Sequence, residues 1–148
     1  MGFKQEIYVA ADNIVINPKN EVLLICRKND PFKDKWAFPG GFVEKEEELN
    51  QAAVRELNEE TGLNIDASEA KLVKTIGTVG RDPRFRTVSV VFLIHLNEEA
   101  DVVGADDAAE ARWFDLNSLP LLAFDHSKIL ETVLADEVFD KSSTTETE

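Results

Sequence analysis

The chain has 148 residues, 43% of them hydrophobic and 30% charged, and its 16 Lys and Arg against 29 Asp and Glu give a net charge of −13. This length and balance predict one soluble globular domain and exclude a disordered chain. No long nucleic-acid partner is expected, because the excess negative charge repels a phosphate backbone. No membrane partner is expected either, since the longest uncharged apolar run, residues 87–96, is about half of the ~20 residues that a spanning helix needs.

Apolar runs rich in β-branched residues and bounded by turn residues predict five strands, and two further stretches predict helices. In chain order, the expected elements are strands 8–16 and 21–27, helix 47–61, strands 71–78, 87–96 and 110–114, and a helix from 125 to about 138. The first two strands flank Asn17-Pro18-Lys19-Asn20, whose turn chemistry predicts a hairpin. Strands before, between and after two helices predict a mixed α/β sandwich, a sheet flanked by helices.

The ends of the chain and its single cysteine bear on domain organisation and compartment. Residues 1–6 lack the apolar stretch of a signal peptide, and Cys26 alone cannot form an internal disulfide, so we expect a cytoplasmic protein. Residues 141–148, KSSTTETE, have nothing to bury. We therefore expect a single domain over residues 1–140 and a disordered acidic tail over 141–148.

The helix expected over residues 47–61 breaks its own amphipathic pattern. On a helical wheel Glu56 and Glu60 fall inside the apolar face, which is formed by Leu49, Ala52, Ala53 and Leu57. Two ionised carboxylates in such a place repel each other and cost several kcal/mol unless a cation compensates them. The alternative, a solvated helix rich in glutamate, would turn its leucines outward as well.

The charge around this helix indicates which cation is needed. Residues 41–63 hold seven Glu against one Lys and one Arg, so the chain itself does not neutralise them. Arg55 lies one turn before Glu59, where it can pair with that carboxylate and hold its orientation. Hard divalent ions prefer oxygen ligands, and Mg²⁺ in particular uses one or two carboxylates plus water and phosphate oxygens. The sequence therefore predicts a site for Mg²⁺, with Mn²⁺ as a second possibility.

The spacing of Gly41, Glu47 and residues 55–63, RELNEETGL, matches every fixed position of the Nudix box, and the chain resembles the Nudix hydrolases. The resemblance implies an α/β/α sandwich with a mixed sheet, and magnesium-assisted attack of water on a nucleoside diphosphate linked to another moiety. It implies metal ligation by Glu56, Glu60 and the carbonyl of Gly40, with Glu59 as a further ligand or the base. Glu47 resembles the box glutamate that supports the loop or contacts a metal through water.

Segments outside the box resemble the ADP-ribose pyrophosphatase branch of this family; they are residues 31–44, 80–84, 109–114 and 122–126. This implies hydrolysis of ADP-ribose to AMP and ribose 5-phosphate by a homodimer with strand 8–16 at or near the interface. In this interpretation Arg27 and Arg81 or Arg84 neutralise phosphate oxygens, although a surface position for each arginine carries equal weight. Asp82 and Arg84 would bind sugar hydroxyls.

The sequence alone leaves two roles unassigned, the base that activates water and the side chain that stacks on adenine. The base that activates water is either Glu59 in the box or a residue on a late loop, Glu110 or else Asp106 or Asp107. The adenine could stack on an aromatic side chain, but core packing is at least as plausible for each candidate, namely Trp36, Phe38 and Phe85. His95 is interpreted as a core residue and His126 as a structural one.

Two other functions fit the same resemblance. A sensor that binds ADP-ribose without cleaving it would most simply show a gap among Glu56, Glu59 and Glu60, and there is none. A Nudix enzyme for oxidised nucleoside triphosphates or dinucleoside polyphosphates would need further positive charge, which this acidic chain scarcely offers.

Overall fold

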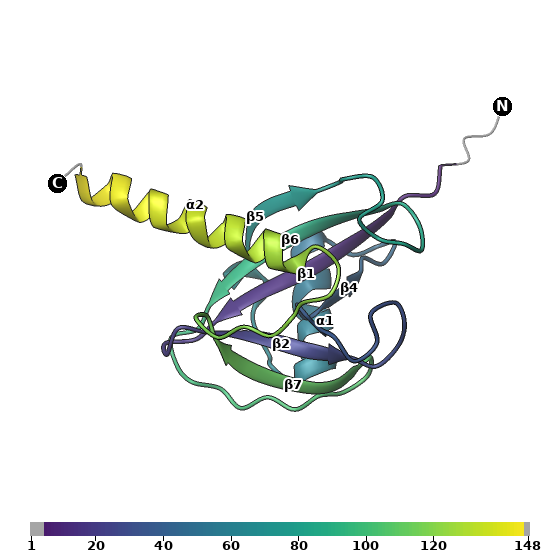
Figure 1. The fold of residues 1–148 in the computed structure, drawn as a ribbon, viewed down its shortest axis with the longest axis horizontal. Helices are drawn as coiled ribbons and strands as arrows, with labels where there is room; N and C mark the ends of the chain where they lie inside the picture. The colour runs from purple at the N-terminus through teal and green to yellow at the C-terminus, as the bar shows by residue number, and fades with distance from the viewer. Residues whose placement is uncertain (1–4, 147–148) are drawn as a thin grey trace.

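A computed structural model describes residues 5–146 and shows a mixed sheet with one helix on each face (Figure 1). Within these residues the sheet has seven strands: the five that the sequence predicted and two more that are too short to stand out in it. The elements are β1 (Tyr8–Ile16), β2 (Glu21–Arg27), β3 (Trp36–Ala37), β4 (Gly40–Phe42), α1 (Leu49–Thr61), a 3₁₀ turn η1 (Ala67–Glu69), β5 (Lys71–Ile76), β6 (Thr87–His95), β7 (Ala108–Asp115) and α2 (His126–Glu146). No helix in this part of the chain is long and apolar enough to cross a membrane.

The expected hairpin of β1 and β2 is joined only next to its turn. Ile16 pairs with Val22, and from there the two strands separate. β4 takes the freed edge of β1, β3 takes that of β2, and the far edges pair with β6 and β7. The separation leaves a space between β1 and β2 that side chains of both strands line.

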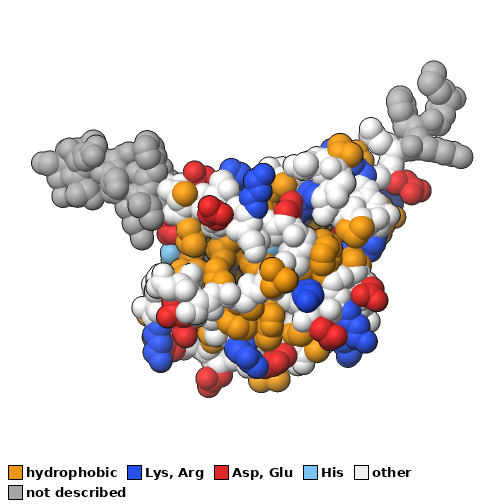
Figure 2. Space-filling view, viewed as in Figure 1, with side chains coloured by type: hydrophobic (Ala, Val, Ile, Leu, Met, Phe, Trp, Pro, Cys, Tyr) orange, Lys and Arg blue, Asp and Glu red, His pale blue; other side chains and the backbone are white. Residues whose placement is uncertain are grey.

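The core has two layers, one on each face of the sheet, because successive side chains of a strand point to opposite faces. On one face Ile14 and Ile16 of β1 pack with the buried side chains of α2, which are Ile129, Leu130 and Val133. On the other face Ala11 and Val15 join the clusters that contain Ala52, Ala53 and Leu57 of α1. Figure 2 views the face that carries α2, where hydrophobic side chains gather below the helix among charged ones.

Helix α1 begins two residues later than expected and ends where expected. Its N-cap is Glu48, whose N–H donates to Gln51 Oε1 at 3.1 Å, and Gly62 ends it with a left-handed φ of 80°. The expected apolar face is correct for Ala52, Ala53 and Leu57, which are fully buried, but wrong for Leu49, which is 39% exposed. The first turn of the helix therefore lies beyond the edge of the core.

Strand β1, which was expected at or near a dimer interface, is an inner strand of the sheet, and the interface itself stays a prediction. All residues of β1 from Ala10 onward are buried within one chain, because β4, β6 and both helices cover them. Only its start, at Tyr8, is exposed. The expectation that His95 is a core residue was wrong, since this side chain is half exposed and pairs with Glu137 at 2.5 Å.

The C-terminal helix is longer than expected. α2 continues beyond residue 138 to Glu146, so it includes residues that were expected to form the tail. Residues 147 and 148 lie outside the described residues. The division into a domain over 1–140 and a tail over 141–148 stays a prediction.

Candidate active site

The space between β1 and β2 is a cavity of about 550 Å³, a usual size for a small-molecule site. Strands, both helices and the loop before β6 all contribute to its walls. Of the residues expected to act, nine line it: Arg27, Phe38, Gly40, Glu56, Glu60, Arg81, Asp82, Arg84 and Asp107. Arg55, Glu59 and Glu110 are not among the lining residues.

Glycines bring β4 close to the two carboxylates of α1. The N–H of Gly40 donates to Glu60 Oε1 at 2.7 Å. A Cβ on Gly41 would lie 2.5 Å from the carboxyl carbon of Glu56, and a Cβ on Gly40 would lie 2.3 Å from the backbone oxygen of Ala11. No real Cβ comes so near to another atom, so the bend at Pro39-Gly40-Gly41 permits a contact that any other residue would block.

The wheel placed Glu56 and Glu60 toward the core, and the structure confirms it. Glu60 is only 3% exposed, and burial, with the nearby charges of Glu56, Asp107 and Asp12, raises its pKa to about 9. Burial also raises the pKa of Glu56, although the Arg55 guanidinium opposes the rise. Both carboxylates are thus held where ionisation is costly unless positive charge arrives.

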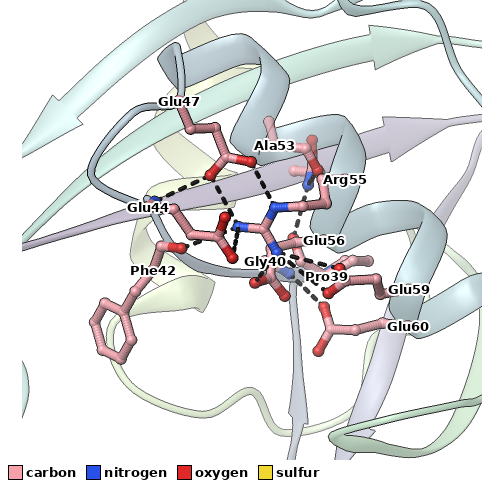
Figure 3. A network of polar contacts seen from close by, with 11 residues as sticks. Pro39, Gly40, Phe42, Glu44, Glu47, Ala53, Arg55, Glu56, Glu59 and Glu60 are labelled. Carbon is pink, nitrogen blue, oxygen red and sulfur yellow. Dashed lines mark hydrogen bonds and ion pairs between the residues drawn. The ribbon is translucent and has the colours of Figure 1, made fainter.

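Arg55 joins the box helix to the loop before it (Figure 3). Its guanidinium donates to Glu47 Oε1 at 2.9 Å, to Glu56 Oε1 at 2.9 Å and to Glu59 Oε2 at 3.2 Å, and to the carbonyl oxygen of Phe42. The hydrogen bond with Arg55 lowers the pKa of Glu47. The expected pair of Arg55 and Glu59 is present, but it lies at the edge of a network whose main partners are Glu47 and Glu56.

The late loop brings Asp107, and not Glu110, to the cavity. The N–H groups of Val103 and Ala105 donate to the carbonyl oxygens of Thr61 and Glu60, which fastens the loop to the C-terminal end of α1. Asp107 lines the cavity beyond this attachment. Glu110 is 48% exposed and paired with Arg112 on the same strand.

The three arginines of the cavity are held in different ways. Arg81 is 5% exposed, and its guanidinium binds both oxygens of Asp125, at 3.0 and 2.8 Å, and the hydroxyl of Ser89 at 2.7 Å. Arg84 binds both carboxylate oxygens of Asp82 in the same two-pronged manner, so Asp82 already has a partner within the chain. Arg27 donates from Nε to the carbonyl oxygen of Pro31 at 2.7 Å.

The aromatic candidates for adenine stacking are packed against protein neighbours. Phe38 is 2% exposed and stacks on His126, with ring centroids 4.5 Å apart. His126 lines the cavity, accepts a hydrogen bond from the Phe38 N–H at Nδ1, and has its pKa lowered to about 3 by burial; its structural role stays a prediction. Trp36 meets Phe114 edge-on.

Asp12 and Phe124 are among the cavity residues that sequence reasoning did not single out. Asp12 is buried on β1, with its pKa raised to about 6 by that burial, and the Ser89 hydroxyl donates to it. The sequence did contain a signal for Asp12, because an Asp followed by an Asn is unusual inside an otherwise apolar strand. Phe124 follows Leu122-Ala123, and nothing local distinguished it from a core residue.

The donor set suits a hard divalent cation. Glu56, Glu60 and the backbone of Gly40 offer only oxygen ligands, which Mg²⁺ and Mn²⁺ prefer. In the described part of the chain, no three His, Cys, Asp or Glu side chains by themselves form a group that could hold an ion. A bound ion would therefore also use backbone and substrate oxygens, which is common for Mg²⁺.

Comparison with known proteins identifies the family. A family model described as the NUDIX domain matches residues 7–134, which is most of the chain. The chain belongs to the Nudix family. The segment that matches the Nudix box, residues 41–63, follows Gly40 directly and carries the carboxylates of α1.

Individual relatives extend this result. The chain is 48% identical over 128 residues to an ADP-ribose pyrophosphatase of Methanocaldococcus jannaschii, covering 83% of this chain and 70% of that one. It is 39% identical over 119 residues to the ADPR responsive transcriptional repressor NtrR of Acinetobacter baylyi, covering 78% of this chain and 47% of that one.

One of the solved structures that resemble this chain has a closely similar fold. The structure of a bifunctional NMN adenylyltransferase/ADP ribose pyrophosphatase from Francisella tularensis, complexed with AMP and a Mn ion, matches with a TM-score of 0.82 at 32% identity. The match covers 90% of this chain and 42% of that one. The chain thus spans less than half of this relative and of the repressor.

Proposed function

We propose that this protein hydrolyses the pyrophosphate bond of ADP-ribose to AMP and ribose 5-phosphate, with Mg²⁺ or Mn²⁺ as cofactor. The observation that carries the proposal is the meeting, in one cavity, of half-buried Glu56 and buried Glu60 with three arginines. Such a site pairs oxygen ligands for a cation with donors for a doubly charged diphosphate. The likeness to an ADP-ribose pyrophosphatase at 48% identity supports the choice of substrate.

In this mechanism the chain binds and orients the diphosphate, and water attacks one of its phosphorus atoms. The guanidinium groups of Arg27 and Arg84 donate to non-bridging oxygens, while Arg81 keeps its place through Asp125. Water loses a proton to a carboxylate, the new P–O bond forms, and the bridging P–O bond breaks. The two products leave as phosphate monoesters.

Glu56, Glu60 and the Gly40 carbonyl would hold the cation. When bound, it supplies positive charge that neutralises the diphosphate and eases deprotonation of the attacking water. Arg55 orients Glu56 and Glu59 by hydrogen bonds, so its part is to position other groups. For the base that accepts the proton of the attacking water, we favour Asp107 over both Glu110 and Glu59. Asp107 lines the cavity, whereas Glu110 does not, and Glu59 faces solvent beside Arg55.

The assembly and compartment belong to the same proposal. We expect a homodimer in the cytoplasm, acting on a nucleoside diphosphate-linked small molecule. Since β1 is an inner strand, an interface on the N-terminal side would use the exposed start of that strand near Ile7 and Tyr8. Light scattering at micromolar concentration tests this, and a monomer would contradict it.

A turnover assay tests the function. The purified protein is mixed with ADP-ribose, other ADP-sugars, an oxidised nucleoside triphosphate and a diadenosine polyphosphate, with Mg²⁺, with Mn²⁺ and with a chelator. Chromatography should show AMP and ribose 5-phosphate, faster than any other product and only with a divalent ion. Preference for a triphosphate would contradict the substrate, and binding of ADP-ribose without turnover would favour a sensor, as the likeness to a repressor allows.

Two variants show whether a positive result comes from this site. Glu60→Gln keeps an oxygen for the Gly40 N–H but removes the buried charge, and it should abolish turnover. Glu46→Gln is the matched control, because this glutamate is exposed just before the helix and outside the cavity.

A further inference from the structure

One side chain of the inner strand β1 is polar where its neighbours on the same face of the sheet are apolar. These neighbours are Ala11 and Val15, which pack against α1, and Asn13 points the same way because alternate residues of a strand share a face. Asn13 is fully buried and does not line the cavity. It is therefore placed to act on the site only through other residues.

The amide of Asn13 joins the two segments that form the candidate metal site. Its Nδ2 donates to the carbonyl oxygen of Pro39 at 3.1 Å and to that of Ala53 at 2.9 Å. Pro39 directly precedes Gly40, whose carbonyl is an expected ligand. Ala53 lies on the inward face of α1, which also carries the two carboxylates (Figure 3). One side chain thus fixes the spacing between the bend and the helix.

The hydrogen-bonding needs of the core do not explain this amide. The carbonyl oxygen of Pro39 also accepts the backbone N–H of Asn13 at 2.9 Å, and that of Ala53, inside α1, has the N–H four residues further on as its regular partner. The amide oxygen of Asn13 is buried and has no partner among the described residues, which is unfavourable in a core. An apolar side chain here would leave no acceptor unpaired, so the two bonds of Nδ2 are additional to those that the backbone requires.

The position of these bonds gives them a use in the site. A cation that binds a backbone oxygen together with carboxylates depends on the distance between the two segments. The Gly40 N–H also joins them, by donating to Glu60 Oε1 at 2.7 Å, but that bond occupies an oxygen of an expected ligand. The bonds of Asn13 lie in the core behind the ligands and do not compete with an ion. Groups that orient metal ligands from behind typically change metal affinity by about 10- to 100-fold when they are removed.

We propose that Asn13 is a positioning residue for the metal site. Its amide holds the bend at Pro39 and helix α1 at the spacing at which the Gly40 carbonyl and the carboxylates of α1 bind one cation. This role rests on the cation site of the proposed function but not on the identity of the substrate. Binding of the metal alone therefore tests it.

The experiment is a titration with Mn²⁺ in the absence of any nucleotide, with the free ion measured by electron paramagnetic resonance. Asn13→Leu keeps the branching and the number of side-chain atoms but has no donor, and it should weaken Mn²⁺ binding roughly 10- to 100-fold. Asn17→Leu is the matched control, because Asn17 is also buried and its side chain makes three hydrogen bonds in the turn after β1, outside the cavity. Structural damage should be at least as large in this control, yet its Mn²⁺ affinity should stay near the wild-type value.

Several results would overturn the proposal. Wild-type Mn²⁺ affinity in Asn13→Leu would do so, and so would an equal loss in Asn17→Leu. Should Asn13→Leu fail to fold, the side-chain amide signals of the wild-type protein in NMR decide: those of Asn13 should shift on titration with Mg²⁺ and those of Asn17 should not, and an unmoved Asn13 signal would overturn the proposal.

Glu60→Gln separates this proposal from the proposed function. If this variant binds Mn²⁺ as tightly as the wild type, the ion lies elsewhere and both proposals fail. If Glu60→Gln loses the ion but Asn13→Leu keeps it, only the role of Asn13 fails. If both variants lose the ion but the wild type does not cleave ADP-ribose, the role of Asn13 stands and only the proposed activity fails.

Discussion

Substitution of Gly41 by alanine should damage catalysis far more than folding. Its Cβ would stand 2.5 Å from the carboxyl carbon of Glu56 and 2.6 Å from both oxygens, about 1 Å closer than ordinary contact allows. The atoms in the way are the end of a flexible side chain, so Glu56 can yield without a backbone shift. An off-rotamer side chain and a weakened bond to Arg55 together cost about 1–2 kcal/mol of stability.

The same displacement has a larger effect on rate. Moving a group of the active site by about 1 Å can cost on the order of 100-fold, so we expect kcat/KM for ADP-ribose to fall about that much in Gly41→Ala. Gly40→Ala should instead fail to fold well, because its Cβ meets backbone atoms of Ala11 and Asp12 at 2.3 and 2.9 Å. Gly77→Ala is the control, since its Cβ would meet Val88 at an ordinary 3.6 Å.

Steady-state kinetics with Mg²⁺ and urea unfolding of the three variants measure both effects. Near wild-type kcat/KM in Gly41→Ala would refute the reasoning, because Glu56 would then either lie elsewhere or not take part. A loss of stability as large as that of Gly40→Ala would also refute it, since the clash would then reach the backbone.

Three further predictions concern carboxylates and one histidine. Glu56→Gln and Glu60→Gln should each lower turnover by several orders of magnitude yet leave the metal-free fold intact or slightly more stable, because a neutral amide replaces a carboxyl group whose ionisation at this place is costly; near-normal activity in kinetic assays would contradict the metal site. Asp107→Asn should slow turnover strongly with little change in the affinity for Mg²⁺, and Glu110→Gln should be mild; the opposite order in the same assays would move the base to Glu110. Because burial lowers the pKa of His126 to about 3, its contribution to stability is present above the unfolded pKa of about 6.5 and is lost as the pH falls from there toward 3. The unfolding free energy of wild type should therefore fall relative to that of His126→Asn by up to about 1.4 kcal/mol per pH unit, and parallel pH profiles in urea would contradict this.

Local sequence determined the helix of the box and the two carboxylates that it turns inward. Both follow from interactions between residues close in sequence. An α-helix has 3.6 residues per turn, which places Glu56 and Glu60 on the same face as Ala53 and Leu57, and Gly62 ends the helix. The bend at Gly40 and Gly41 was equally visible. These features depend on residues close in sequence, so no knowledge of distant contacts was needed to predict them.

Tertiary structure decided the rest of the site, because it depends on contacts between residues far apart in the chain. Arg81 is held by Asp125, 44 residues away, and Asp107 rather than Glu110 enters the cavity because the loop before it is fastened to α1. Where β1 and β2 separate, which creates the cavity, the edges that they free pair with β4 and β3 instead. Local propensity does not encode which edges meet, since each strand could pair on either side, and the choice is made only when the whole sheet and its two cores form together.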